Sequence, residues 1–202
     1  MSTATPTGLI TAEQFFEMQF DEPVELVRGK VVPKYRWCDR YSSPAIGSVL
    51  ARIVAALSEW ADAGSHGVVA VGADLDTPAV GANSTVRMEI AFYPTSVLSD
   101  GKFRTEAPLE VPSLGAIVLD PDDCFAGVMD RIRALLAAGV KEVWLVDYSS
   151  HFISVSRPHR DDMGLWDGDS SIKSALLPGF KHPVRNFFST IQRPAREPHP
   201  HA

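Results

Sequence analysis

Apolar residues recur at helical spacing in two stretches of the chain. The first begins at Ser43-Pro44, a pair typical of a helix N-terminus, and continues to Trp60. The second begins at Phe125 and stops at Gly139, a residue type favoured just past a helix end. Both stripes predict amphipathic helices that bury one face. Their other apolar members are Ile46, Val49, Leu50, Ile53, Val54 and Leu57 in the first stripe, and Val128, Ile132, Leu135 and Leu136 in the second.

The strands of a sheet are predicted between and after these helices. Residues 85–93 alternate between apolar and polar positions, which indicates a strand with one polar face. Residues 114–119, LGAIVL, are apolar on both faces, as is typical of a central strand covered on each side. Strand, helix and strand across 113–148 have the length of a βαβ unit, so we expect an α/β fold with a mixed sheet flanked by helices. In the 85–93 strand we expect Val86, Met88, Ile90 and Phe92 on one face and Arg87, Glu89 and Ala91 on the other.

Two small elements are predicted before the first long helix. Thr11, followed three residues later by Gln14, forms a capping-box pattern that predicts a short helix. Two short β runs flank Arg28-Gly29, which predicts a tight hairpin.

Length and composition indicate one soluble domain. The 202 residues suit a single core, which we place at 1–192, and the polar, Pro-rich residues 193–202 are expected to form a disordered tail. An apolar fraction of 45% and a charged fraction of 22% are ordinary for a globular protein, and no apolar run is long enough to cross a bilayer. The chain starts without a signal peptide, and Cys38 and Cys124 are too few for a disulfide framework, so we expect a cytoplasmic protein.

A local basic segment is the best candidate for a nucleic-acid surface. The net charge of −6 opposes non-specific attraction to DNA, because such affinity comes from Lys and Arg on phosphates. Residues 28–41 nevertheless interleave basic and aromatic side chains, a composition that suits a nucleic-acid strand but also a solvated hairpin and loop. The basic residues of this segment are Arg28, Lys30, Lys34, Arg36 and Arg40.

Four stretches of the chain, in one order and at one spacing, carry a family resemblance. They are TAEQFFEMQFDEPVELVRGKVV (11–32), VRMEIAFYP (86–94), LLAAGVKEVWLVD (135–147) and LPGFKHPVRNFF (177–188). Together they resemble the Uma-two family of putative restriction endonucleases, a branch of the PD-(D/E)XK nuclease superfamily. The resemblance covers most of the chain. It implies a restriction-endonuclease-like core, self-association as a homodimer or higher homo-oligomer, and an ancestral Mg²⁺-dependent hydrolysis of phosphodiesters.

That chemistry needs two carboxylates at adjacent strand ends to hold a divalent cation, and a nearby lysine to orient the attacking water. The resemblance places the family's first metal-binding aspartate at Glu89 and its central-strand glutamate at Ile117. It places the family's lysine at Arg131, which stays protonated and cannot act as a base. A histidine of the family falls on Ile46, whereas its glutamate near the hairpin is kept as Glu25.

These departures leave two interpretations of the site. In the first, the fold is retained and the catalytic site is degenerate, so the protein needs no metal and persists as a binding or self-associating protein. In the second, the site has migrated, and the protein is an active DNA endonuclease that uses Mg²⁺ or Mn²⁺. Glu89 would then share the metal with Asp120 or Asp122, while Arg131 would hold phosphate. The same aspartates also suit a solvated turn and helix N-cap, and Glu89 also suits an ion pair with Arg131 or Arg87.

Overall fold

The structure is a computed structural model that describes most of the chain. The described residues are 8–20, 24–27, 29–33, 44–77, 84–103, 110–119, 123, 125–160 and 163–192. Its elements are α1 (Ala12–Glu17), β1 (Val24–Val27), β2 (Lys30–Pro33), α3 (Pro44–Gly64), β3 (Gly67–Asp76), β4 (Thr85–Pro94), the 3-10 helix η2 (Thr95–Val97), β5 (Leu114–Val118), α4 (Phe125–Ala137), β6 (Glu142–Asp147), β7 (Phe152–Ser156), β8 (Gly164–Trp166), β9 (Ser171–Ile172), β10 (His182–Pro183) and α5 (Val184–Phe187).

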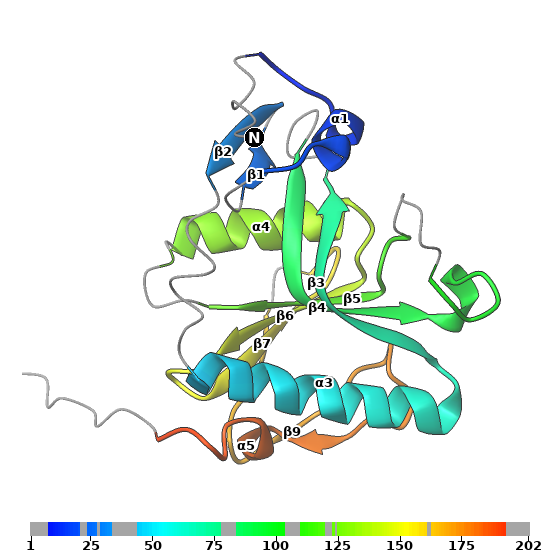
Figure 1. Ribbon diagram of the computed structural model, residues 1–202. Helices are drawn as coiled ribbons and strands as arrows, with labels where there is room; N and C mark the ends of the chain where they lie inside the picture. Colours follow the sequence, from blue (N-terminus) through cyan, green and yellow to red (C-terminus); the bar gives the residue numbers. More distant parts are fainter. Residues whose placement is uncertain are drawn as a thin grey trace, which may run out of the picture.

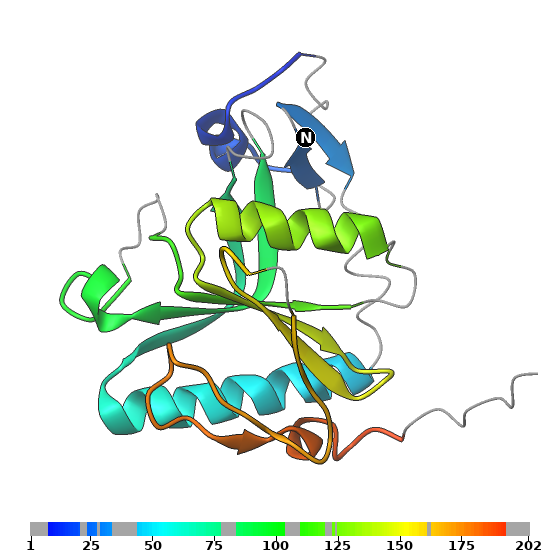
Figure 2. The same ribbon diagram turned by 180° about the vertical axis from the view of Figure 1, so that it is seen from behind.

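Six strands form one mixed sheet between two layers of helices. Their order is β3-β4-β5-β6-β7-β8, and β5 and β6 are the parallel pair, joined through α4. The other neighbours in this sheet pair antiparallel. Helix α4 covers one face, while α3 and α5 cover the other (Figures 1 and 2). The predicted α/β class, with a mixed sheet flanked by helices, is confirmed.

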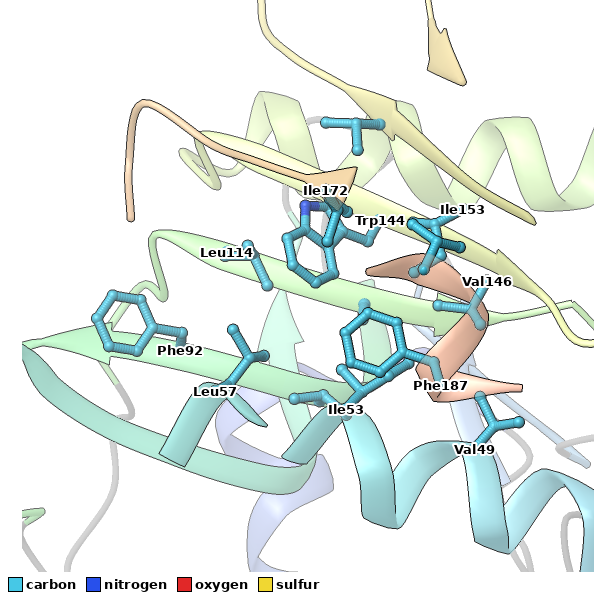
Figure 3. Packing of buried hydrophobic residues seen from close by; sticks show 14 of the residues in the cluster. Val49, Ile53, Leu57, Phe92, Leu114, Trp144, Val146, Ile153, Ile172 and Phe187 are labelled. Atoms are coloured by element: carbon cyan, nitrogen blue, oxygen red, sulfur yellow. The ribbon is translucent and has the colours of Figure 1, made fainter. Parts of the chain in front are cut away.

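The larger core lies between the sheet and α3. Helix α3 contributes a stripe of buried residues at helical spacing that includes Ile53 and Leu57, as its sequence pattern predicts. These side chains meet Phe92 and Trp144 from the sheet and Phe187 from α5 (Figure 3). The short helix α5 therefore completes the cover of this face.

A second core lies between the sheet and α4. Val128, Ile132 and Leu135 of α4 are buried against Ile117 and Leu145, which lie on neighbouring parallel strands. Because cores lie on both faces, the β5 strand is buried along its full length, as expected for LGAIV.

The β3–β4 hairpin breaks the alternation that residues 85–93 predict. Val86 and Met88 belong to the α4-side core together with Ala91, whereas Ile90 and Phe92 belong to the α3-side core. The prediction of one apolar face opposite one polar face is therefore wrong. Apart from Arg87 and Pro94 the strand is buried throughout.

The break lies at Gly72 and Glu89. The β3–β4 register runs without interruption on either side of them, but these two residues are not paired. Gly72 has a φ of 73°, in the left-handed region that favours glycine. A Cβ at this position would lie only 2.7 Å from Arg87 Nη2. The hairpin changes face at this point, and its far half rises past α4 toward α1 (Figure 1).

The small N-terminal elements agree with their sequence patterns. Thr11 Oγ1 accepts a hydrogen bond from Gln14 N at 3.1 Å, and Gln14 Oε1 accepts one from Thr11 N at 2.9 Å, which completes the predicted capping box. Strands β1 and β2 pair antiparallel with Val27 opposite Lys30, and Gly29 has a φ of 77°. The hairpin prediction is confirmed. No helix in the described part of the chain is both long and apolar enough to span a bilayer.

A buried carboxylate fixes the C-terminal arm, the segment from β9 to α5, to the sheet. Glu142, at the start of β6, is fully buried. It accepts hydrogen bonds from Trp144 Nε1 at 2.7 Å, Arg157 Nε at 2.8 Å and Ser174 Oγ at 2.9 Å. Three donors from separate segments thus compensate for the desolvation of one charge.

Ring stacking and a hydrogen bond from α3 also hold the C-terminal arm in place. The His182 ring stacks on Phe187 with centroids 4.5 Å apart, and Trp60 Nε1 donates to Pro178 O at 2.9 Å. Burial lowers the pKa of His182, against the opposing attraction of Glu59, so the neutral imidazole is the form that packs here.

We expect Glu142→Ala to destabilise the fold by about 3 kcal/mol, because it leaves a partly buried guanidinium and two buried donors without their acceptor. The measurement is equilibrium denaturant unfolding. The matched control is Asp130→Ala, since Asp130 forms an exposed pair with Arg133 on α4 and its loss should cost less than about 0.5 kcal/mol. Equal effects of the two substitutions would contradict this account of Glu142.

Candidate functional site

The candidate site lies where β4 separates from β5. The two strands pair from Phe92 opposite Leu114 to Ile90 opposite Ala116, and then part. Strand β5 continues to Val118, which pairs on its other side with β6. A strand that parts from its neighbour leaves backbone amides without ladder partners, and burial makes this costly.

Glu89 fills the gap with its side chain. Its Oε2 atom accepts a hydrogen bond from Val118 N at 2.9 Å. The Glu89 side chain is only 1% exposed, so this bond forms away from water. The carboxylate therefore takes the place of the departing strand as the partner of β5.

Arg131 approaches the same carboxylate from α4. Its Nη2 atom lies 3.7 Å from Glu89 Oε1 and donates a hydrogen bond to Arg87 O at 3.2 Å. The interpretation that Glu89 forms an ion pair with Arg131 is confirmed. Arg131 is 25% exposed, so one side of the pair reaches the surface while the carboxylate stays buried.

A further ion pair and a neutral phenol lie nearby on β3 and β4. Arg87 Nη1 is 3.2 Å from Asp74 Oδ2, with both side chains about one-third exposed. Burial, and next the charge of Asp74, raise the pKa of Tyr93 to about 12. Tyr93 is therefore a neutral phenol near pH 7 and does not serve as a base.

Ile117 directly precedes the amide that Glu89 binds. It is fully buried, and it faces the α4-side core, the same layer from which Arg131 reaches Glu89. The position that the family resemblance assigns to a second carboxylate is thus part of a continuous apolar core.

Of the other predicted site residues, one lies in the opposite core, two lie in the N-terminal hairpin, and the rest lie outside the described residues. Ile46 is buried in the α3-side core, on the opposite face of the sheet from Arg131. Glu25 lies in β1 opposite Val32, and its side chain is outside the described part. Lys30 is exposed on β2. Outside the described residues lie Arg28, Lys34, Arg36, Arg40, Asp120 and Asp122.

Two further carboxylates, Glu142 and Asp147, are buried and hydrogen-bonded, which their sequence context does not predict. Glu142 attracted no interpretation from sequence, because its partners Arg157 and Ser174 are distant along the chain. Asp147, at the end of β6, is buried and accepts hydrogen bonds from the backbone amides of Ser149 and Ser150. The Asp-x-Ser-Ser spacing after an apolar run was the available signal for this turn.

The described donor set does not fit a divalent cation. Within the part of the chain that the structure describes, no three His, Cys, Asp or Glu side chains come together as a metal-binding group. Glu89 directs one carboxylate oxygen to Val118 N and the other toward Arg131. Mg²⁺ and Mn²⁺ sites need oxygen donors free to enter the coordination shell.

Comparison with known proteins identifies a shared fold. No protein-family model matches the chain, and no curated protein matches it. The chain is similar to the crystal structure of "a putative nuclease belonging to DUF820" from Anabaena variabilis ATCC 29413. The TM-score is 0.71 at 17% sequence identity, and the match covers 89% of this chain and 98% of that chain. The class that the architecture defines is therefore a nuclease-like α/β fold.

We expect Arg131→Met to destabilise the protein by about 3 kcal/mol, because it removes a counter-charge from beside the buried Glu89 carboxylate. Glu89→Gln should rescue part of this loss, since the amide oxygen still accepts from Val118 N and carries no charge. A double-mutant cycle measured by denaturant unfolding should therefore give a coupling of about 1 kcal/mol or more.

The matched control for this cycle is Arg133→Met, two residues further along α4, which removes an exposed pair and should change stability by less than about 0.5 kcal/mol. Strict additivity of Arg131→Met and Glu89→Gln would contradict a direct electrostatic link between the two side chains.

Proposed function

We propose that this chain is a divergent Uma-two-type protein that keeps the nuclease-like fold, has lost metal-dependent phosphodiester hydrolysis, and acts as a binding or self-associating protein. The observation that supports this most strongly is the state of Glu89. Its carboxylate is buried, bonded to a backbone amide and paired with Arg131.

The charge balance of the site supports the same conclusion. In a metal-dependent nuclease the cation offsets the charge of the carboxylates that hold it. Here a fixed guanidinium offsets the charge of Glu89. To bind a cation, Glu89 would have to give up the Arg131 pair or leave Val118 N unsatisfied inside the protein.

The two other catalytic positions cannot supply the missing chemistry. Ile117 offers no oxygen donor and excludes water from its surroundings. Arg131 can hold an anion but cannot accept a proton from water at any usable pH. The described side chains at the Glu89 site therefore hold neither an open pair of carboxylates nor a base positioned to activate a nucleophile.

The fold likeness supports descent from a nuclease scaffold but not its activity. The similar solved protein is described as a putative nuclease, and at 17% identity the likeness extends to the fold. One scaffold supports many functions, so activity has to be argued from the site.

We expect the wild-type protein to show no Mg²⁺ or Mn²⁺ binding by calorimetry and no metal-dependent nicking of supercoiled plasmid. The contradicting result is nicking that requires metal and is lost in Asp120→Asn/Asp122→Asn, which would establish the migrated site with Glu89. That double variant is preferable to Glu89→Ala as the control, because Glu89 is buried and its removal perturbs the fold.

A gain-of-site variant gives a readout that does not depend on activity. Ile117→Glu combined with Arg131→Met replaces the apolar side chain with a second carboxylate and removes the competing guanidinium. We expect Mn²⁺ to raise the melting temperature of this variant and to leave that of the wild type unchanged, because a ligand that binds only the folded state stabilises it. Equal stabilisation of both proteins by Mn²⁺ would contradict the proposal.

A further inference from the structure

The two edges of the central sheet differ in length. One edge is β8, with three residues, and the other is β3, with ten. A short edge strand offers little backbone for pairing, whereas a long one is a template for another strand unless charge, proline or a bulge blocks it. In β3 the break in pairing at Gly72 leaves Gly67–Val71 as a regular segment.

This segment carries none of the usual blocking residues. Its sequence, GVVAV, has no charge and no proline. Val71 is 65% exposed, although it is a branched apolar residue in a strand. Among the described strands, β4 is the partner of β3, on the inner side.

The hydrogen-bond pattern determines which residues point their backbone outward. Thr95 N donates to His66 O at 3.0 Å, and these two residues lie opposite each other when the β3–β4 register is extended. Residues that exchange bonds with a neighbour alternate with residues that face away from it. Val69 therefore directs its N–H and C=O to the open edge, and so do Gly67 and Val71.

We propose that the outer edge of β3 pairs antiparallel with the same edge of a second copy of this chain, with Val69 on the twofold axis. This register places Gly67 opposite the partner's Val71, so all three outward-facing residues of each copy exchange backbone hydrogen bonds with the other. A shift of two residues in either direction would leave some of these groups unpaired. The inference is independent of the proposed loss of nuclease chemistry.

Side-chain shape also favours a second copy as the occupant. Gly67 cannot carry a side chain, because a Cβ there would overlap Tyr93 O. In the proposed register the exposed Val71 of one copy lies opposite Gly67 of the other, which has no side chain to obstruct the approach. Antiparallel pairing also places the Asp74 and Asp76 side chains of the two copies at opposite ends of the interface.

Cysteine cross-linking tests the register. In a background with Cys38 and Cys124 replaced by Ser, Val69→Cys should form a disulfide-linked dimer under mild oxidation. Directly opposite residues have Cα atoms about 5.5 Å apart, within disulfide range. The control is Val71→Cys, whose side chain is far more accessible but whose twin lies about 13 Å away along the strands. Equal or faster cross-linking of Val71→Cys would overturn the register.

Solution mass tests the interface itself. Light scattering should give twice the 22.0 kDa chain mass at high concentration, with a monomer fraction that grows on dilution. Val71→Lys should shift the protein to monomer, because it places a charge at the pairing edge. Leu165→Lys on β8 is the matched control, since Leu165 is equally exposed at 65%, and it should leave the mass unchanged. The proposal would be overturned if the wild type and Val71→Lys had the same mass at every concentration. It would also be overturned if Leu165→Lys dissociated the dimer to the same extent as Val71→Lys.

Discussion

The Glu89 carboxylate lies where β4 leaves β5, and two groups share it as a partner. One is the Val118 amide of a strand that is buried on both faces. The other is the Arg131 guanidinium, which α4 brings down onto the sheet. A backbone donor and a cation thus share one buried anion, and the contact joins sheet and helix. Removing one member would take a polar partner from a buried or half-buried group, which is costly.

Under the proposed function, the same contact lets a nuclease-like fold persist without an open metal site. In a metal enzyme of this class the carboxylates at the strand ends are stabilised by the cation that they hold. Here Arg131 gives Glu89 a permanent counter-charge, and Ile117 extends the α4-side core up to the amide that Glu89 binds. Protein groups thus pair with the described polar groups around Glu89, which supports the proposal that the fold can be kept without the hydrolytic chemistry.

Sequence reasoning succeeded where a pattern is local. The α3 stripe, the Thr11 capping box and the buried β5 strand depend on spacing within one element, and the structure has them as predicted. It failed in β4, where alternation is interrupted opposite Gly72 by a break in the paired strand. The Glu89–Arg131 pair was one of several alternatives, because the spacing of residues along the sequence does not give the distance between a strand and a helix. The role of Glu142 was not predicted, because its partners Arg157 and Ser174 reach it only in the folded chain.

The most direct test of the central claim is the anomalous difference density of Mn²⁺ in crystals of the wild-type protein grown with an excess of that ion. The account predicts Glu89 within hydrogen-bond distance of Val118 N, Arg131 beside it, and no anomalous peak within coordination distance of either carboxylate oxygen. A peak bound by Glu89, with Arg131 displaced and an aspartate from residues 120–122 completing the shell, would contradict it.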